Sequence, residues 1–224
     1  MKRSSRLNCA GGLSEELYGQ ASGAIDFELS AEWDRKCDAG RWCAAVVFAA
    51  VERVRYVAFS HVESDECGGL NQWLEVAPRA VPVCGALAAL ISINDLADRL
   101  PRGLQDGEGL SLGTRTVRWF ETPHLPHGWE SGLLLDEQTR TLFCGDLLTQ
   151  PGAVTPAVTE SDILGPSEGF RRAMDYYAHA PGTTAQIERL AKAEPTTLAC
   201  MHGSAWTGDG GRLLRALAAE LARG

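Results

Sequence analysis

His61-Val62-Glu63-Ser64-Asp65-Glu66 is the stretch that decides how the rest of this chain is interpreted. It follows residues 54–60, an apolar, β-branched and aromatic run that predicts a buried strand. Gly68 and Gly69 then interrupt the strand, and residues 70–77 predict a helix that ends before Pro78. One imidazole and three carboxylates therefore lie on a turn from strand to helix. In α/β proteins, sites are formed at such carboxyl ends of strands.

The acidic side chains of this turn have two interpretations. A solvated acidic turn is the simpler one, because exposed carboxylates need no partner. Here, however, the preceding strand is predicted to be buried, and the glycines hold the loop close to the sheet. Carboxylates crowded into a partly desolvated place repel one another, and their pKa values rise unless a cation neutralises them. We therefore favour metal binding at this turn.

Composition sets limits on the class of protein. The chain has 224 residues, of which 45% are hydrophobic and 22% charged, as expected for one globular domain with a sizeable core. The net charge is -8 and no long basic run occurs, so nucleic acid and anionic membranes are not expected partners. No apolar run approaches the roughly 20 residues that span a bilayer, and no signal peptide is evident. We expect a cytoplasmic protein.

Cysteine usage argues against a disulfide framework or a cysteine-based zinc site. The number of cysteines is odd and no CxxC pair occurs. The seven are Cys9, Cys37, Cys43, Cys67, Cys84, Cys144 and Cys200. Most are expected to be small buried apolar residues, and Cys67 is the exception because it adjoins the acidic turn.

Strand and helix patterns alternate after the acidic turn, which predicts a layered α/β fold. The expected strands are residues 80–84, 110–112, 116–120, 132–135, 141–144 and 196–200, with hairpins around Gly113 and across residues 136–138. The expected helices are residues 85–100, two between 167 and 193, and an amphipathic helix at 212–223. Residues 1–45 show no clear pattern, and residues 42–51 suit a strand or a short helix. We predict a divergent N-terminal segment, 1–45, and one metal-binding domain, 46–224.

Four of the five histidines are expected at strand ends or turns. They are His61, His124, His127 and His202. Two prolines make the segment that holds His124 and His127 rigid, and Asp146 likewise follows an apolar strand. A single histidine is more often structural than a ligand, but this shared position favours a metal site. His179, predicted to lie within a helix, keeps the structural interpretation.

The order of these residues resembles the signature of the metallo-β-lactamase fold. The matching pieces are His61-x-Glu63-x-Asp65, His127, Asp146 after an apolar strand, and His202-Gly203. In particular the chain resembles the diiron branch, which comprises the core domain of flavodiiron proteins and the related oxygen-binding diiron proteins. The resemblance extends from about residue 54 to the C-terminus. It implies an αββα sandwich with two metal ions in a cleft between the ends of two sheets.

The resemblance also implies a set of ligands. One iron would be bound by His61, Glu63 and His127, the second by Asp65 and His202, and Asp146 would bridge both. We choose His127 because it lies four residues before Ser131, in a His-x-x-x-Ser pattern that is common after the ligand in this fold. His124 remains the alternative ligand. Otherwise it is a candidate catalytic residue that orients a ligand or the bound oxidant, or moves protons.

The identity of the metal, and one of two departures from the family pattern, depend on residues of the acidic turn. Zinc hydrolases of this fold carry histidine at the position of Glu63, and a carboxylate there favours iron. The family usually has histidine directly after the aspartate, whereas this chain has Glu66. Glu66 could supply an oxygen to the second iron, hold a water, move protons or line the pocket. The fold also opens with an Asp-x-Gly turn, for which Asp38-Ala39-Gly40 is the nearest match.

Three functions follow from these observations. The favoured one is a non-haem diiron protein with two iron ions that binds or reduces dioxygen or another small oxidant. It would be an oxygen sensor, or an oxidoreductase fed by a separate redox donor protein, because no phosphate-cradling glycine loop for flavin is evident. The alternative is a hydrolase with two zinc ions that acts on a thioester, lactone or phosphoester. The third is a binding module whose metal site is structural or lost. A homodimer is compatible with the family.

Overall fold

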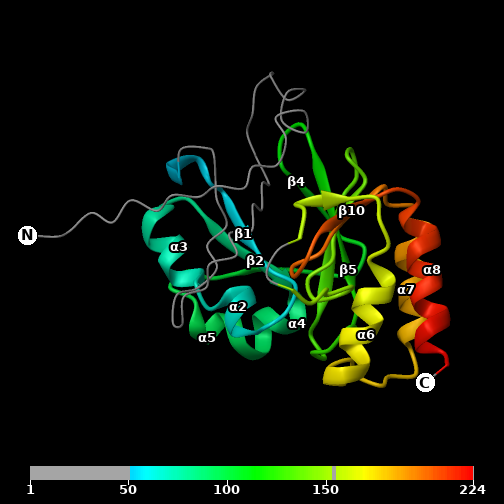
Figure 1. Cartoon of the computed structure of the whole chain (residues 1–224). Helices are drawn as coiled ribbons and strands as arrows, with labels where there is room; N and C mark the ends of the chain where they lie inside the picture. Colours follow the sequence, from blue (N-terminus) through cyan, green and yellow to red (C-terminus); the bar gives the residue numbers. More distant parts are fainter. Residues whose placement is uncertain (1–50, 153–154, 224) are drawn as a thin grey trace, which may run out of the picture.

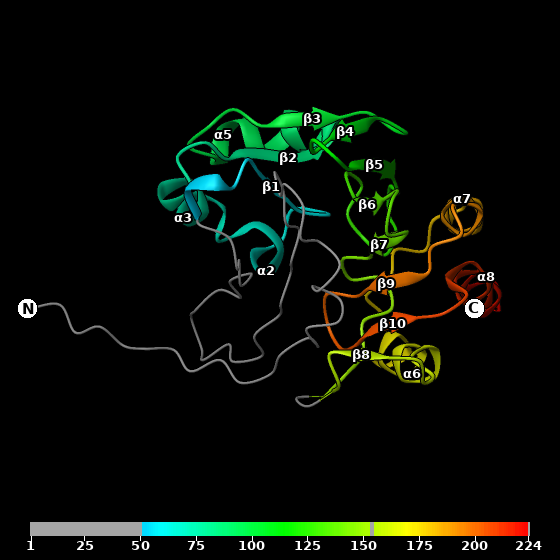
Figure 2. The same ribbon diagram turned by 90° about the horizontal axis from the view of Figure 1, so that it is seen from above.

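The computed structural model describes residues 51–152 and 155–223. Two β-sheets pack against each other, and helices cover the outer face of each sheet (Figure 1, Figure 2). This arrangement confirms the αββα sandwich of the metallo-β-lactamase type. No helix among these residues is long and apolar enough to cross a membrane. The predictions for residues 1–45, for most of residues 42–51 and for the turn at Asp38 lie outside the described residues.

The smaller sheet has three parallel strands in the order β1-β2-β3. They are β1 (Tyr56–Ala58), β2 (Val81–Gly85) and β3 (Arg102–Leu104), preceded by the short 3-10 helix η1 (Val51–Arg53). The first crossover contains α2 (Ser64–Cys67) and α3 (Leu70–Val76). The second contains α4 (Ala86–Ala88), the π-helical turn η2 (Ala89–Ile93) and α5 (Asn94–Leu96), one helical run in place of the longer helix predicted.

Strand β1 is shorter than predicted because the chain leaves the smaller sheet after Ala58. The carbonyl oxygen of Ser60 already accepts a hydrogen bond of 3.0 Å from the backbone N–H of Gly132, in the larger sheet. The backbone that leads to His61 therefore crosses from one sheet to the other. This crossing places the acidic turn at the junction of the two sheets.

The larger sheet has seven strands in the order β4-β5-β6-β7-β9-β10-β8. They are β4 (Gly109–Ser111), β5 (Thr116–Glu121), β6 (Gly132–Asp136), β7 (Thr141–Phe143), β8 (Val158–Thr159), β9 (Thr197–Ala199) and β10 (Ala205–Thr207). The antiparallel pairs β4–β5 and β6–β7 confirm both predicted hairpins. Strands β7 and β9 are far apart in the sequence but are parallel neighbours, with Leu142 opposite Leu198. This pairing brings together the loops that carry Asp146 and His202.

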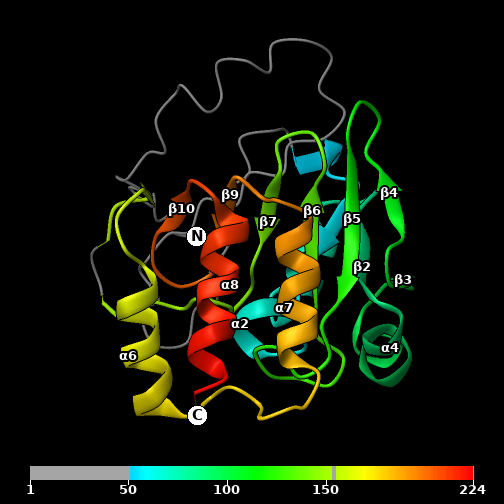
Figure 3. The same ribbon diagram turned by 90° about the vertical axis from the view of Figure 1, so that its right-hand side faces the viewer.

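Three helices cover the outer face of the larger sheet (Figure 3). They are α6 (Leu164–Met174), α7 (Thr183–Lys192) and α8 (Gly210–Leu221). The side chain of Asp209 caps α8 by accepting a hydrogen bond of 2.9 Å from the N–H of Arg212. The prediction that His179 lies within a helix is wrong. Asp175 adopts a left-handed conformation that ends α6, and His179 lies exposed in the next loop, 3.0 Å from the Asp175 carboxylate.

Three apolar clusters hold the layers together. Between the two sheets, Val83 and Leu104 from the smaller sheet pack with Trp119 from the larger, and all three are fully buried. The cysteines described as buried are Cys84, Cys144 and Cys200, whereas Cys67 is partly exposed. The loops that follow β1, β5, β7 and β9 carry the residues expected to form the site.

Candidate metal centre

His61 is fixed in a single orientation by the residue before it. Its side chain is 1% exposed, and its Nδ1 atom lies 2.7 Å from the hydroxyl of Ser60. The next backbone N–H, that of Val62, donates to the carboxylate of Glu130 at 3.0 Å. Because Nδ1 is engaged by Ser60, Nε2 is the nitrogen left to face the neighbouring acidic and imidazole groups.

Four of the predicted ligands converge on one point. The Nε2 atoms of His61 and His127 are 3.1 Å apart, and a Glu63 oxygen lies 3.1 Å from His127 Nε2. Asp146 Oδ2 lies 3.8 Å from the first of these nitrogens and 3.5 Å from the second. One ligand atom of each of the four residues lies within 4.8 Å of the others. Opposite ligands of an ion with bonds of about 2.1 Å are separated by about 4.2 Å, so these atoms can surround one metal ion.

The remaining two predicted ligands form a second group beside the first. His202 Nε2 lies 3.3 Å from Asp65 Oδ2 and 3.3 Å from Asp146 Oδ1. Asp146 therefore turns one carboxylate oxygen toward each group. The second group is on average the more open one: the side chains of Asp65 and His202 are 45% and 41% exposed, whereas those of Glu63, His127 and His61 are 45%, 20% and 1% exposed. We call the two sets the inner group (His61, Glu63, His127) and the outer group (Asp65, His202), with Asp146 between them.

The loop after β5 separates its two histidines. The hydroxyls of Thr122 and Ser131 both donate to the carbonyl oxygen of Leu125, at 3.2 and 3.1 Å, and thereby close the loop. His127 joins the inner group. His124 has a positive φ of 65° and is exposed, and within the described part of the chain its side chain makes no hydrogen bond or ion pair with the inner or outer group.

Tyr176 supports the inner group from the helical layer. Its ring lies at the edge of the His127 ring, with 5.9 Å between centroids, and its hydroxyl donates to the carbonyl oxygen of Asp146 at 3.3 Å. Burial raises the pKa of Tyr176 to about 12, so the hydroxyl remains a donor. Tyr176 thus fixes the loops of His127 and Asp146 relative to each other.

Glu66 lies against Ser60 and His61 of the inner group. One of its carboxylate oxygens accepts a hydrogen bond of 3.2 Å from the N–H of Ser60, and the other lies 4.0 Å from His61 Nδ1. That second oxygen is buried and has no hydrogen-bond partner among the described residues. Burial raises the pKa of Glu66 to about 7, although the hydrogen bond from Ser60 opposes the change.

The charges of Asp146 and His202 depend on each other. Burial alone would raise the pKa of Asp146, but the hydrogen bond and positive charge of His202, with His61 and His127, hold it below the ordinary value. The hydrogen bond to Asp146 raises the pKa of His202, although burial opposes this. Three imidazoles thus surround one carboxylate, a charge distribution that a bound cation would replace.

Sequence reasoning missed two residues that position the groups, namely Glu130 and Gln150. Gln150 is buried and connects two loops: its amide donates to the carbonyl oxygens of Leu148 and Ser204, at 3.2 and 3.1 Å. Its own carbonyl accepts from the N–H of Ser204 at 3.0 Å. Its backbone N–H donates to the carbonyl oxygen of His202 at 2.9 Å. No sequence signal marked these residues, because each acts through contacts that only the folded chain creates.

Replacing Gln150 with leucine keeps the volume but removes the side-chain hydrogen bonds to Leu148 and Ser204. We expect the free energy of unfolding to fall by about 1–3 kcal/mol, because buried partners lose their bonds, and the loop of His202 to loosen. Urea unfolding measures the first effect, and chelator competition for bound metal measures the second. Gln72→Leu, on the exposed face of α3, is the control and should change neither. An unchanged stability of Gln150→Leu would refute the role of the amide.

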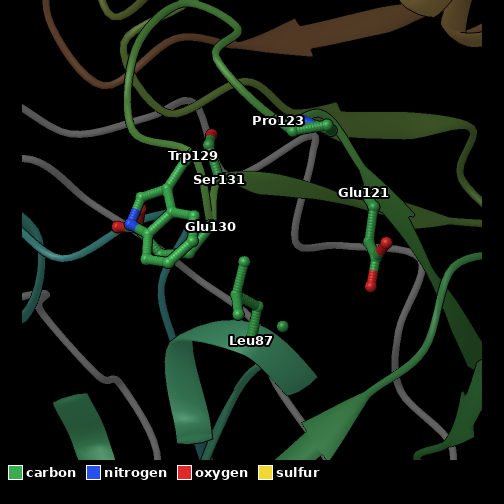
Figure 4. A pocket seen from close by; sticks show the side chains of 7 residues that line it. Leu87, Glu121, Pro123, Trp129, Glu130 and Ser131 are labelled. Atoms are coloured by element: carbon green, nitrogen blue, oxygen red, sulfur yellow. The ribbon is translucent and has the colours of Figure 1, made fainter. Parts of the chain in front are cut away.

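A small pocket lies beside the loop of His127 but holds none of the residues of the two groups. It is lined by Gly85, Leu87, Glu121, Pro123, Trp129, Glu130 and Ser131 (Figure 4). Trp129 is 55% exposed at its rim, while Glu130 reaches from the pocket to the N–H of Val62. The pocket is therefore connected to the metal-binding groups through Glu130, which binds the backbone next to His61, and through Ser131, which closes the loop of His127.

The fold and the candidate site together define the class of protein. Two sheets between helices, with histidine and carboxylate ligands on the loops at one junction, are the arrangement of a metal-binding metallo-β-lactamase fold. A family model described as "ODP family beta lactamase" matches residues 44–203, which is more than half of the chain. The chain belongs to this family. No curated protein matches the sequence.

Solved structures similar to this chain share its fold. The chemotaxis sensor ODP, solved as a peroxy diiron species, is 20% identical with a TM-score of 0.64 over 76% of this chain and 73% of its own. The rubredoxin oxygen:oxidoreductase of Desulfovibrio gigas is 19% identical, with a TM-score of 0.62 over 79% and 45%. The flavodiiron protein of Giardia intestinalis is 21% identical, with a TM-score of 0.63 over 78% and 44%. This chain thus spans less than half of the last two proteins.

Proposed function

We propose that this protein is a non-haem diiron protein that binds or reduces dioxygen or a related small oxidant. The observation that carries the proposal is the position of Asp146. One oxygen of its carboxylate faces the imidazoles of the inner group, and the other faces His202 of the outer group. A carboxylate that serves two neighbouring sets of ligands is suited to bridge a pair of metal ions.

The residues fit two metal ions. In the inner group, His61, Glu63 and His127 would hold one ion together with Asp146, and Asp65 and His202 would hold the other. Asp146 Oδ1 is buried and lies 3.3 Å from His202 Nε2, as expected of an oxygen that shares a metal ion with this imidazole. Three imidazoles and three carboxylates form a mixed set of donors, which suits iron better than an imidazole-rich set would.

The two groups would have different tasks. A pair of ferrous ions supplies electrons to a bound oxidant. The outer group, with fewer protein ligands and more exposed side chains, leaves space on its solvent side for that small molecule. Glu66, buried against Ser60 and His61, can hold a proton within 4.0 Å of the His61 ring. His124, exposed on its loop, would act on an oxidant that approaches from solvent.

Electrons for repeated turnover would come from a separate donor protein. Two of the similar structures are a flavodiiron protein and a rubredoxin oxygen:oxidoreductase, and both chains are more than twice as long as the part that this chain matches. The chemotaxis sensor ODP, by contrast, is matched over 73% of its length. Within the proposal, a sensor of dioxygen needs no donor, whereas a reductase does.

Metal analysis and an absorption spectrum test the proposal directly. Protein purified without air should contain iron at about two ions per chain, and admitting air should change its near-ultraviolet and visible absorption. Two zinc ions and no change in the spectrum would instead support a hydrolase, to be tested with thioesters, lactones and phosphoesters. One ion or none would support the binding module.

A matched pair of variants tests which histidine of the rigid loop is the ligand. His127→Asn should lose metal from the inner group, because the imidazole that meets His61 and Glu63 is removed. His124→Asn should keep its metal, and asparagine tolerates the positive φ at that position. Metal content after dialysis against a chelator measures both. The reverse result would make His124 the ligand.

A further inference from the structure

Two cysteines lie side by side directly beneath the loops of the metal groups. Strands β7 and β9 are parallel neighbours, and Phe143 is paired with Ala199 at their carboxyl ends. Cys144 and Cys200 follow as the next residues in this register. The N–H of Cys144 donates to the carbonyl oxygen of Ala199 at 2.9 Å, and the N–H of Met201 donates to Gly145 at 3.0 Å. Backbone hydrogen bonds on both sides therefore hold the two cysteines in place.

The geometry of this pair suits a bond between the sulfur atoms. Neighbouring strands lie about 4.7–4.9 Å apart, and disulfides require Cα atoms separated by about 4.4–6.8 Å. Residues opposite each other on paired strands point to the same face of a sheet, and both cysteines belong to the core between this sheet and its helices. Each thiol donates to the carbonyl oxygen two residues earlier on its own strand, Cys144 to Leu142 at 3.4 Å and Cys200 to Leu198 at 3.9 Å. Both thiols are free and buried.

We propose that Cys144 and Cys200 are a reversible dithiol–disulfide couple, oxidised by a small peroxide. Each cysteine lies two residues before a member of the metal groups, since Asp146 follows Cys144 and His202 follows Cys200. A disulfide would therefore join the two loops at their base. The proposal rests on strand register and is independent of which metal the site holds.

The chemistry balances with hydrogen peroxide as the oxidant. The sulfur of one thiol attacks a peroxide oxygen, the O–O bond breaks, and a sulfenic acid and one water form. The second thiol attacks that sulfur, the S–S bond forms, the S–O bond breaks, and a second water leaves. Two thiols lose two electrons and two protons in total, and one peroxide becomes two waters. A dithiol reductant reverses the change by thiol–disulfide exchange.

Burial restricts which oxidants can react. Cys144 is 0% exposed and Cys200 1%, so the oxidant has to be small enough to enter the packed layer between the sheet and its helices. Cys67 and Cys84 provide an internal comparison. They pack in the cluster of the smaller sheet but come from a helix and a strand, without a shared register.

Peptide mapping of the intact protein tests the proposal. Protein reduced under argon is divided, one half is treated with hydrogen peroxide, and free thiols in both halves are blocked before digestion without reductant. We expect the treated half to yield a crosslinked peptide containing Cys144 and Cys200, and dithiothreitol added after digestion to separate it into two peptides with free thiols. Cys84→Ser is the control and should leave the yield of this peptide unchanged, whereas Cys144→Ser should abolish it.

The outcomes are distinct. Sulfinic or sulfonic acid at Cys144 or Cys200 without the crosslinked peptide would overturn the proposal, and so would thiols that remain reduced after prolonged treatment. A crosslink between Cys67 and Cys84 in its place would also overturn it. Because mapping uses the unaltered chain, the test holds even if Cys144→Ser folds poorly. Loss of metal in the same sample would bear on the diiron proposal and not on the disulfide.

Discussion

Replacing Asp146 with alanine is expected to remove both metal ions from the protein. Its two carboxylate oxygens face the inner and outer groups separately, so one substitution takes a ligand from each. The loss also removes the anionic charge that lies among His61, His127 and His202, and this charge would offset the positive charge of the bound ions. Metal content after dialysis, measured at equal protein concentration, should fall to a small fraction of the unaltered value.

Two further variants show whether the loss of both ions is specific to Asp146. His202→Ala should lose the outer ion and keep the inner one, because its imidazole belongs to the outer group alone. Asp95→Ala, at an exposed position on α5, should keep both ions. Circular dichroism verifies that each variant is folded. Full metal content in Asp146→Ala would show that the two groups are not the site.

Replacing Gly145 with alanine is expected to destabilise the protein and weaken metal binding together. Gly145 has a positive φ of 49°, and a Cβ atom there would lie 2.4 Å from the hydroxyl oxygen of Ser60 and 2.9 Å from its Cβ. The left-handed backbone costs about 1–2 kcal/mol and the overlap about 1–3 kcal/mol, so unfolding should become easier by about 2–5 kcal/mol. Ser60 orients His61, and displacing it should lower metal affinity.

Replacing Gly107 with alanine separates the cost of the left-handed backbone from the cost of the overlap with Ser60. It also has a positive φ, of 74°, but a Cβ atom there would meet nothing within 4 Å. Gly107→Ala should therefore show only the cost of the backbone, about 1–2 kcal/mol, with metal binding unchanged. Urea unfolding and chelator competition measure both variants. Equal losses of stability in the two would mean that contact with Ser60 is unimportant.

The strand pairs and the layered fold could be predicted because they depend on local patterns. The hairpins on either side of Gly113 and of residues 136–138 combine alternating apolar residues with turn residues, and the structure contains both. The short β1 could not be predicted in the same way. Its end is set by a hydrogen bond from Gly132, a residue 72 positions after Ser60.

In the candidate site, too, the sequence predicted the residues that follow strands but not the residues whose partners come from distant parts of the chain. His61, Glu63, Asp65, His127, Asp146 and His202 follow strands, and the structure brings their side chains together. Gln150 and Glu130 were invisible in the sequence, because a glutamine or glutamate in a loop is ordinary until its partners are known. His179 was misplaced because nothing at Asp175 signals that the helix ends there. Whether the two groups bind iron stays a prediction.

Because the chain crosses from one sheet to the other at Ser60, the candidate site connects the two sheets. The segment that follows β1 of the smaller sheet carries His61, Glu63 and Asp65. Loops that follow strands of the larger sheet carry His127, Asp146 and His202. Two ions bound as proposed would link the two sheets at their junction. A change in the length of a bond to such an ion would then act on both sheets together.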